Sequence, residues 1–100
     1  MRVIFTKVAE RTYEDVLWFL SEVWIQKEIN VFIRDIESIV NQLIAGKYFM
    51  FQKSINSTRS VLIGKRHIRM YFRKEHENQI KVLLFFDMRQ NPEKIIDLLK

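Results

Sequence analysis

Cysteine is absent from this sequence of 100 residues. Without thiols, neither a disulfide framework nor a thiolate metal site can form, and the chain suits a reducing compartment such as the cytoplasm. Glycine occurs only twice, at Gly46 and Gly64, which excludes a glycine-rich phosphate-binding loop. The two histidines stand without any carboxylate cluster at ligand spacing. We therefore expect no metal site and no cofactor.

Long apolar runs are also missing. The longest, Val82–Phe86, is far too short to span a bilayer, so no membrane partner is expected. The segment Met1–Lys7 lacks the apolar core of a signal peptide. The length predicts a single domain, residues 1–100. The net charge of +5 favours an acidic partner, either nucleic acid or an acidic protein, although a surplus of solvated lysine would give the same value.

The segment 79–87 is the one around which the rest can be placed. It first alternates, with Ile80 and Val82 apolar between Gln79 and Lys81, and is then apolar at every position through Phe86. Strands with one solvated face alternate, whereas strands covered on both faces do not. The pattern predicts a central strand that is covered on both faces after its start.

Two helices are predicted before it, at 7–24 and 27–45, with Gly46 as the stop of the second. Their short connection predicts an antiparallel hairpin. Both carry an apolar stripe at helical spacing: Tyr13, Val16, Leu17, Leu20 and Trp24 in the first, and Ile29, Phe32, Ile33, Ile36, Ile39, Val40, Leu43 and Ile44 in the second.

Strands are predicted at Val3–Phe5 and in a meander at 59–63, 67–74 and 79–87, with turns at 64–66 and 75–78. The connector 47–57 carries Tyr48, Phe49, Met50 and Phe51, expected to plug the sheet edge or the hairpin end. A last helix follows Pro92, with Ile95, Ile96, Leu98 and Leu99 on its apolar side. The fold class is α+β: an N-terminal strand and a helical hairpin packed on a mainly antiparallel sheet of about four strands, with a short C-terminal helix.

Two sets of exposed side chains are candidates for binding. In the middle strand of the meander, Ile68, Met70 and Phe72 should face the helices, which leaves His67, Arg69, Tyr71 and Arg73 on a basic outer face. On the first helix, Trp18 and Phe19 lie off the main stripe. They either pack against a second neighbour or form an exposed patch for a partner.

Four short motifs in order resemble the RelE/ParE superfamily of bacterial toxins from type II toxin–antitoxin systems. Residues 3–10 (VIFTKVAE) are similar to its opening, and residues 59–62 (RSVL) to the basic start of its meander. Residues 69–72 (RMYF) look like its "Y-Y" strand, and residues 86–94 (FDMRQNPEK) like its ending "D-x-R-Q-[DN]-P-x-K". The chain departs from many relatives at 45–47, where Ala-Gly-Lys replaces an "N-P" turn.

The resemblance implies one of two mechanisms of toxicity. RelE-like members are ribosome-dependent, metal-independent endoribonucleases that cut mRNA (mRNA interferases). Here Arg59, Arg69, Arg73 or Arg89 would stabilise charge, and Tyr71, His67 or His76 would transfer a proton. ParE-like members, often linked to plasmid stabilisation, instead inhibit growth by binding DNA gyrase. The final helix has no tyrosine or histidine where RelE-like members keep a proton-transfer group, which favours the ParE-like reading.

The ParE-like reading names Arg69, Arg73, Asp87 and Arg89 as target-binding residues, although Asp87 and Arg89 could form only a local salt bridge. The expected antitoxin is acidic, with a DNA-binding N-terminal half, and would contact Trp18, Phe19, Arg69 and Arg73. A third reading is a toxin fold that retains only antitoxin binding.

Overall fold

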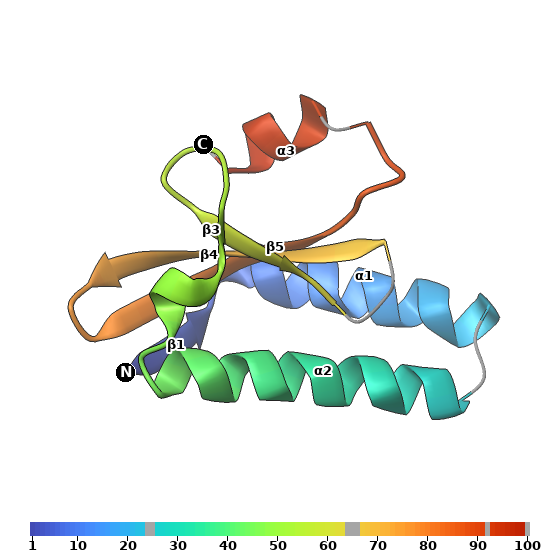
Figure 1. The fold of residues 1–100 in the computed structure, drawn as a ribbon. Helices are drawn as coiled ribbons and strands as arrows, with labels where there is room; N and C mark the ends of the chain where they lie inside the picture. The colour runs from blue at the N-terminus through green and yellow to red at the C-terminus, as the bar shows by residue number, and fades with distance from the viewer. Residues whose placement is uncertain (24–25, 64–66, 92, 100) are drawn as a thin grey trace.

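A computed structural model of the chain describes residues 1–23, 26–63, 67–91 and 93–99, and it has the predicted α+β architecture. The helices α1 and α2 lie on one face of a central sheet and the short helix α3 lies on the other (Figure 1). None of the described helices is long and apolar enough to cross a membrane. In chain order the elements are β1 (Arg2–Phe5), α1 (Lys7–Val23), α2 (Gln26–Ile44), the 3₁₀ turn η1 (Tyr48–Met50), β2 (Gln52–Lys53), β3 (Arg59–Leu62), β4 (Ile68–His76), β5 (Gln79–Asp87) and α3 (Glu93–Leu98).

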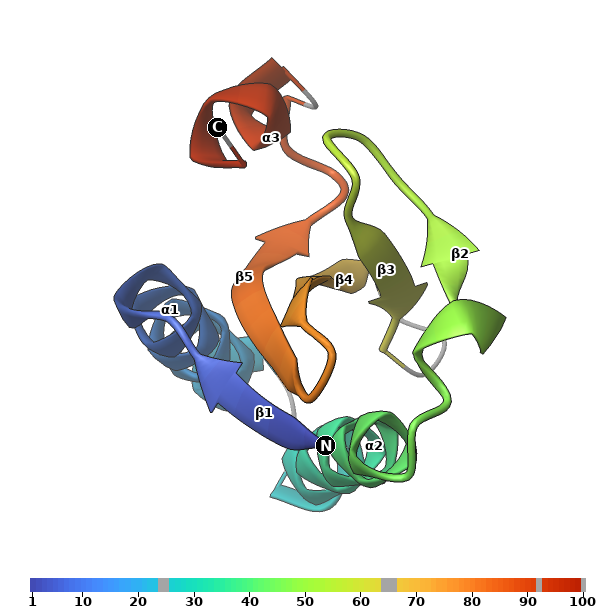
Figure 2. The same cartoon turned by 90° about the vertical axis from the view of Figure 1, so that its left-hand side faces the viewer.

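The sheet has five strands in the order β1-β5-β4-β3-β2 (Figure 2). The strand β1 runs parallel to β5, and the other neighbouring pairs are antiparallel. Because the sequence predicts about four strands, the fifth is a correction. It is β2, which pairs Gln52 with Ser60 and Lys53 with Arg59 inside the predicted connector. Two residues are too few to show the alternation by which a strand is recognised.

The strand β5 is central, between β1 and β4, and is covered on both faces as predicted. Its register to β4 shifts by one residue between Val82 and Leu84. A one-residue bulge reverses the face that each later side chain takes. Val82 and Phe85 accordingly lie in the core beneath α1 and α2, whereas Leu84 and Phe86 lie in the core beneath α3. The uninterrupted apolar run thus reflects both the bulge and the second helical cover.

The helices α1 and α2 form the predicted antiparallel hairpin, with bounds within one or two residues of those expected (Figure 1). Trp24 lies outside the described residues. Gly46 ends α2 as predicted, with a φ of +85° that suits glycine. Its N–H donates to the carbonyl of Leu43 and the N–H of Lys47 donates to the carbonyl of Gln42, each at 3.0 Å. These two bonds are a Schellman motif, which satisfies carbonyls at the helix end.

The predicted stripes of both helices face the sheet. Side chains buried or packed against the core are Tyr13, Val16, Leu17 and Leu20 of α1, and Ile29, Phe32, Ile36, Ile39, Val40 and Leu43 of α2. Ile44, predicted on the same stripe, is instead exposed at the end of α2.

The meander is present at the predicted place, and β4 extends two residues further than expected. The predicted turn 64–66 lies outside the described residues. Beyond Val82, β5 has no strand on its β1 side, and two threonines supply the missing partners. The Thr6 hydroxyl donates to the Leu83 carbonyl at 3.1 Å, and the Thr12 hydroxyl accepts from the Phe85 N–H at 3.0 Å. The start of α1 therefore closes this edge of the sheet.

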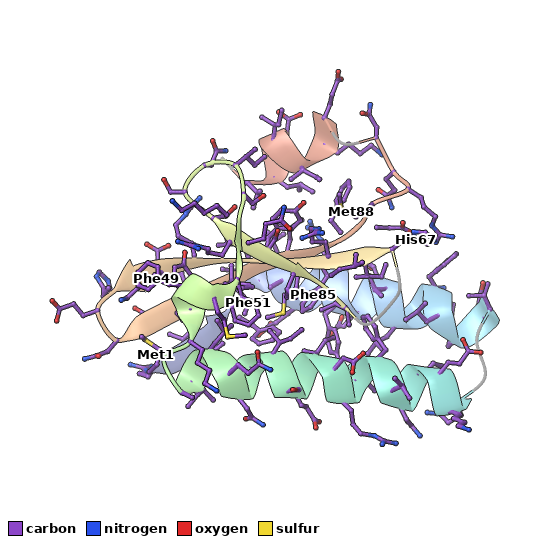
Figure 3. The ribbon with its side chains drawn as sticks, in the orientation of Figure 1. Met1, Phe49, Phe51, His67, Phe85 and Met88 are labelled. Carbon is purple, nitrogen blue, oxygen red and sulfur yellow. The ribbon has the colours of Figure 1, made fainter. Side chains whose placement is uncertain are left out.

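The aromatic connector only partly does what the sequence predicts. Tyr48 and Phe51 are buried and pack edge-on against Phe72, with ring centroids 5.9 and 5.3 Å away. Phe49 is 67 % exposed and Met50 is exposed as well, so the prediction is wrong for these two (Figure 3). The reason is the 3₁₀ turn, since its period of three places Tyr48 and Phe51 on one side.

The last helix is shorter than expected. Ile95 and Leu99 are buried against the sheet, as their i, i+4 spacing allows, but Ile96 and Leu98 are exposed. The prediction of a four-residue apolar side is therefore only half right. A helix of barely two turns presents one narrow stripe to the sheet. Pro92 and Lys100 lie outside the described residues.

Candidate functional site

Two arginines of β4 lie on the sheet face turned away from α1 and α2. Arg69 Nη1 donates to Ser60 Oγ at 3.0 Å and to Gln52 Oε1 at 3.4 Å, and Arg73 Nη2 donates to the Asn56 carbonyl at 3.1 Å. These partners are neutral, and within the described residues neither guanidinium lies in an ion pair. Both charges remain available to an anionic partner. We call Arg69, Arg73, Gln52 and Ser60 the basic face.

Tyr71 lies between these arginines in sequence but is only 3 % exposed. The structure thus corrects the prediction of an open position, because α3 closes this end of the face. Its Oη donates to Met88 Sδ at 3.8 Å. Burial raises the pKa of Tyr71 above its ordinary value of 10.0, while Arg69 and a hydrogen bond with Ser54 oppose that rise. At neutral pH the hydroxyl keeps its proton and is shielded from solvent.

Arg59 fastens the aromatic connector. Its Nη1 donates to the carbonyls of Phe49 and Phe51 at 3.2 and 2.8 Å. Its guanidinium carbon also lies over the rings of Tyr48 and Phe49, 5.4 and 5.2 Å from their centroids. Arg59 pairs opposite Phe72, on the face beneath which α1 and α2 pack, whereas Arg69 is on the other face. The predicted catalytic residue Arg59 is therefore separated from Arg69 and Tyr71 by the sheet.

Asp87 and Arg89 form a local salt bridge, which was one of the two possibilities that the sequence allowed. Arg89 Nε and Nη2 donate to the two carboxylate oxygens of Asp87 at 3.0 and 2.7 Å, and the Arg89 N–H donates to Oδ1 at 2.9 Å. The hydrogen bond from Arg89 is the largest cause that lowers the pKa of Asp87. The Arg89 guanidinium carbon also lies 5.7 Å from the centroid of the Phe19 ring. Arg89 thus points toward α1 and away from the basic face.

The two histidines considered for proton transfer are both exposed and lie at opposite ends of β4. The His67 carbonyl accepts a hydrogen bond from the Met88 N–H at 2.6 Å, and the two residues lie close together at the end of β5 (Figure 3). His76 pairs opposite Gln79 at the other end of that strand pair.

The sequence left open whether Trp18 and Phe19 pack against a neighbour or form an exposed patch, and in the structure they form an exposed patch. Trp18 is 71 % and Phe19 43 % exposed. They lie on α1, which packs along β5, whereas Arg69 and Arg73 reach toward β3 and the β2–β3 loop. The four residues predicted to bind the antitoxin therefore do not form one surface: two lie on α1 and two on β4.

A pocket of about 300 Å³ lies between α1, α3 and the end of β5. Apolar side chains dominate its lining, among them Val16, Phe19 and Leu98, with Asp15 and Lys94 among its charged residues. A second, more open groove of about 530 Å³ runs between α2 and the edge of β3, and Arg69 is part of its wall. Concave sites of this size are the usual places for ligand groups or side chains of partners.

Sequence reasoning missed Ser60 and Gln52 on the basic face, and also the pocket. Ser60 could have been found by aligning β3 with β4, since residues paired across strands share a face. The pocket could not have been found that way, because it depends on how α3 folds back. Of the predicted catalytic set, only Arg69 and Tyr71 are near one another, and of the predicted target-binding set, only Arg69 and Arg73 share a face.

No protein-family model matches this chain, and a search of curated proteins found no match to its sequence. The relation to the RelE/ParE superfamily stays a prediction from the motifs given above.

Proposed function

We propose that this chain is the toxin of a type II toxin–antitoxin pair and that it inhibits growth by binding DNA gyrase in the cytoplasm. The observation that carries this proposal is the dispersal of the groups that RNA cleavage would need. Arg59 is bound to backbone carbonyls beneath the sheet, Arg89 is bound to Asp87, and the Tyr71 hydroxyl is buried. A proton-transfer group must come within hydrogen-bond reach of the substrate, and the burial of Tyr71 leaves its hydroxyl without open access to a ligand.

The basic face supports a binding role instead. Arg69 and Arg73 stand on β4, and their side chains are held by hydrogen bonds to neutral groups. Preorganised, uncompensated guanidinium groups are suited to carboxylates of a protein surface. An acidic segment of the antitoxin would neutralise the toxin by covering the same face. The small open surface of this domain suits a partner that wraps around it as an extended tail.

The mechanism can be tested by expressing the chain alone in bacteria. We expect growth arrest, induction of a DNA-damage reporter and intact mRNA. Cleavage of translated mRNA that requires ribosomes and is lost in Tyr71→Phe would overturn the proposal and make the chain an endoribonuclease. That variant removes only the hydroxyl and keeps the buried ring. It should therefore fold like the wild type, so that any lost cleavage reports the loss of the hydroxyl.

The pairing can be tested with the neighbouring reading frame. We expect it to encode a small acidic protein with a DNA-binding N-terminal half, and its coexpression to relieve the arrest. Normal growth at verified high levels of the folded wild-type chain, together with tight binding of that partner, would leave a toxin fold that retains only antitoxin binding.

A further inference from the structure

An exposed aromatic patch lies on α1, apart from the residues of the basic face. Trp18 and Phe19 are exposed there, and Phe19 also lines the pocket between α1 and α3 together with Leu98. Leaving such side chains in water forgoes the free energy of their burial. Tryptophan in particular is enriched among the residues that dominate protein–protein interfaces. Apolar surface therefore continues from the ridge of α1 into a hollow.

Carboxylates flank Trp18 on α1, whereas the cations Arg89 and Lys94 lie on the Phe19 and pocket side of the patch. Three carboxylates share the side of the helix on which Trp18 lies, because they are three or four residues away from it: Glu14, Asp15 and Glu22. All three are exposed, and within the described part of the chain none of them lies in an ion pair. A partner with acidic residues at this place would meet like charges, whereas a basic partner would be attracted.

A contact within the chain shows which chemical group binds well beside an aromatic ring and a carboxylate. The Arg89 guanidinium lies over the Phe19 ring while both carboxylate oxygens of Asp87 accept hydrogen bonds from it. Aromatic rings attract a cation over their face, and tryptophan does so most strongly. Trp18 with its neighbouring carboxylates repeats this arrangement, and among the described residues no cation lies over its ring.

We propose that Trp18, Phe19 and the adjoining pocket form a docking surface for a basic amphipathic helix of a partner protein. An arginine of the partner lies over Trp18 toward Glu14, Asp15 and Glu22, and a neighbouring apolar side chain enters the pocket beside Leu98. The carboxylates beside Trp18 favour a basic partner, whereas the arginines of the basic face favour an acidic one. The two partners would therefore be different molecules or different segments. The proposal does not depend on the proposed toxin function.

The test uses synthetic helical peptides of about 16 residues and the purified full chain. One peptide carries arginine and leucine on one face, and its control carries glutamate in place of every arginine. We expect the arginine peptide to bind at least ten times more tightly than the glutamate peptide, and to weaken as salt is added. Amide chemical shifts of the labelled protein should change on α1 and α3.

Variants locate the site. Trp18→Ala, at an exposed position, should weaken the arginine peptide at least tenfold, and Leu98→Trp should do so by filling the pocket. The matched control Val31→Ala removes an exposed apolar side chain from α2 and should leave binding unchanged. Equal or tighter binding of the glutamate peptide, full affinity in Trp18→Ala, or shifts confined to β3 and β4 would overturn the proposal. Self-association of the free chain that is lost in Trp18→Ala would also overturn it, because it would assign the patch to a second copy.

Discussion

The two faces of the sheet are covered to different extents. The face toward α1 and α2 is closed by a large core to which β1, β3, β4 and β5 all contribute. The opposite face has a small second core of Tyr71, Leu84, Phe86, Ile95 and Leu99 under α3, and beyond α3 it is open and basic. Stability is thus concentrated on the first face, and the candidate binding residues lie where the second face lacks a cover.

Charge is divided between the helices and the strands. Nine of the twelve acidic residues lie within α1, α2 and α3, together with only five of the seventeen basic ones. The positive net charge therefore comes from the strands and the segments between them. An anionic partner should meet the sheet rather than the helices, which is why net charge alone is a poor guide to the site.

The largest effect on stability is expected from the closed face. Phe72→Ala removes a fully buried ring that contacts Tyr48 and Phe51, and it should lower the free energy of unfolding by about 3–5 kcal/mol. The matched control Phe49→Ala removes an exposed ring and should cost no more than about 1 kcal/mol, the worth of its cation contacts. Denaturant unfolding measures both, and equal losses would contradict the assignment of the core.

A smaller loss is expected under α3. Leu84→Ala should cost about 2–4 kcal/mol and should speed amide exchange in α3 more than in α2. Leu98→Ala, at an exposed position of the same helix, serves as control and should change neither quantity much. If Leu84→Ala loosens α2 as much as α3, the two cores are not separate.

The edge of β5 that α1 closes gives a third comparison, with the edge strand β2 on the other side of the sheet. Thr12→Val keeps the shape of the side chain but removes the acceptor for the Phe85 N–H, and should cost about 1–3 kcal/mol. Thr12→Ser retains the acceptor and should cost less. The exchange rate of the Phe85 amide reports the bond directly, and no change in that rate would show that the threonine does not protect this edge.

The smallest effect is expected from pH at the Asp87–Arg89 pair. Because the folded-state pKa of Asp87 lies below its ordinary value of 3.8, the contribution of the pair is fully present above that pH. It is lost as the pH falls through the lower, folded-state value. The Arg89 Nε signal in NMR should therefore move with a midpoint below 3.8 and stay fixed in Asp87→Asn. A midpoint at or above 3.8 would contradict the bidentate pairing.

Local pattern was enough to predict the two long helices, the stop at Gly46 and the central strand, because each depends on spacing or on one residue type. It could not predict β2, whose two residues have no period, or the exposure of Phe49, which depends on a 3₁₀ turn. The burial of Tyr71 was missed for another reason: which side chains α3 covers depends on the path of the chain after Asp87. The candidate site was therefore predicted only at Arg69 and Arg73.

The most direct test of the account is growth during expression of the double variant Arg69→Glu/Arg73→Glu beside its charge-matched control Arg11→Glu/Arg34→Glu. Both doubles change the net charge equally, but the control reverses exposed arginines of α1 and α2. We expect target inhibition to weaken at least about 100-fold in the first, so that growth resumes, and to persist in the second. Melting curves must show that both variants are folded. Undiminished arrest by Arg69→Glu/Arg73→Glu, or equal rescue by both doubles, would contradict the assignment of the target to the basic face.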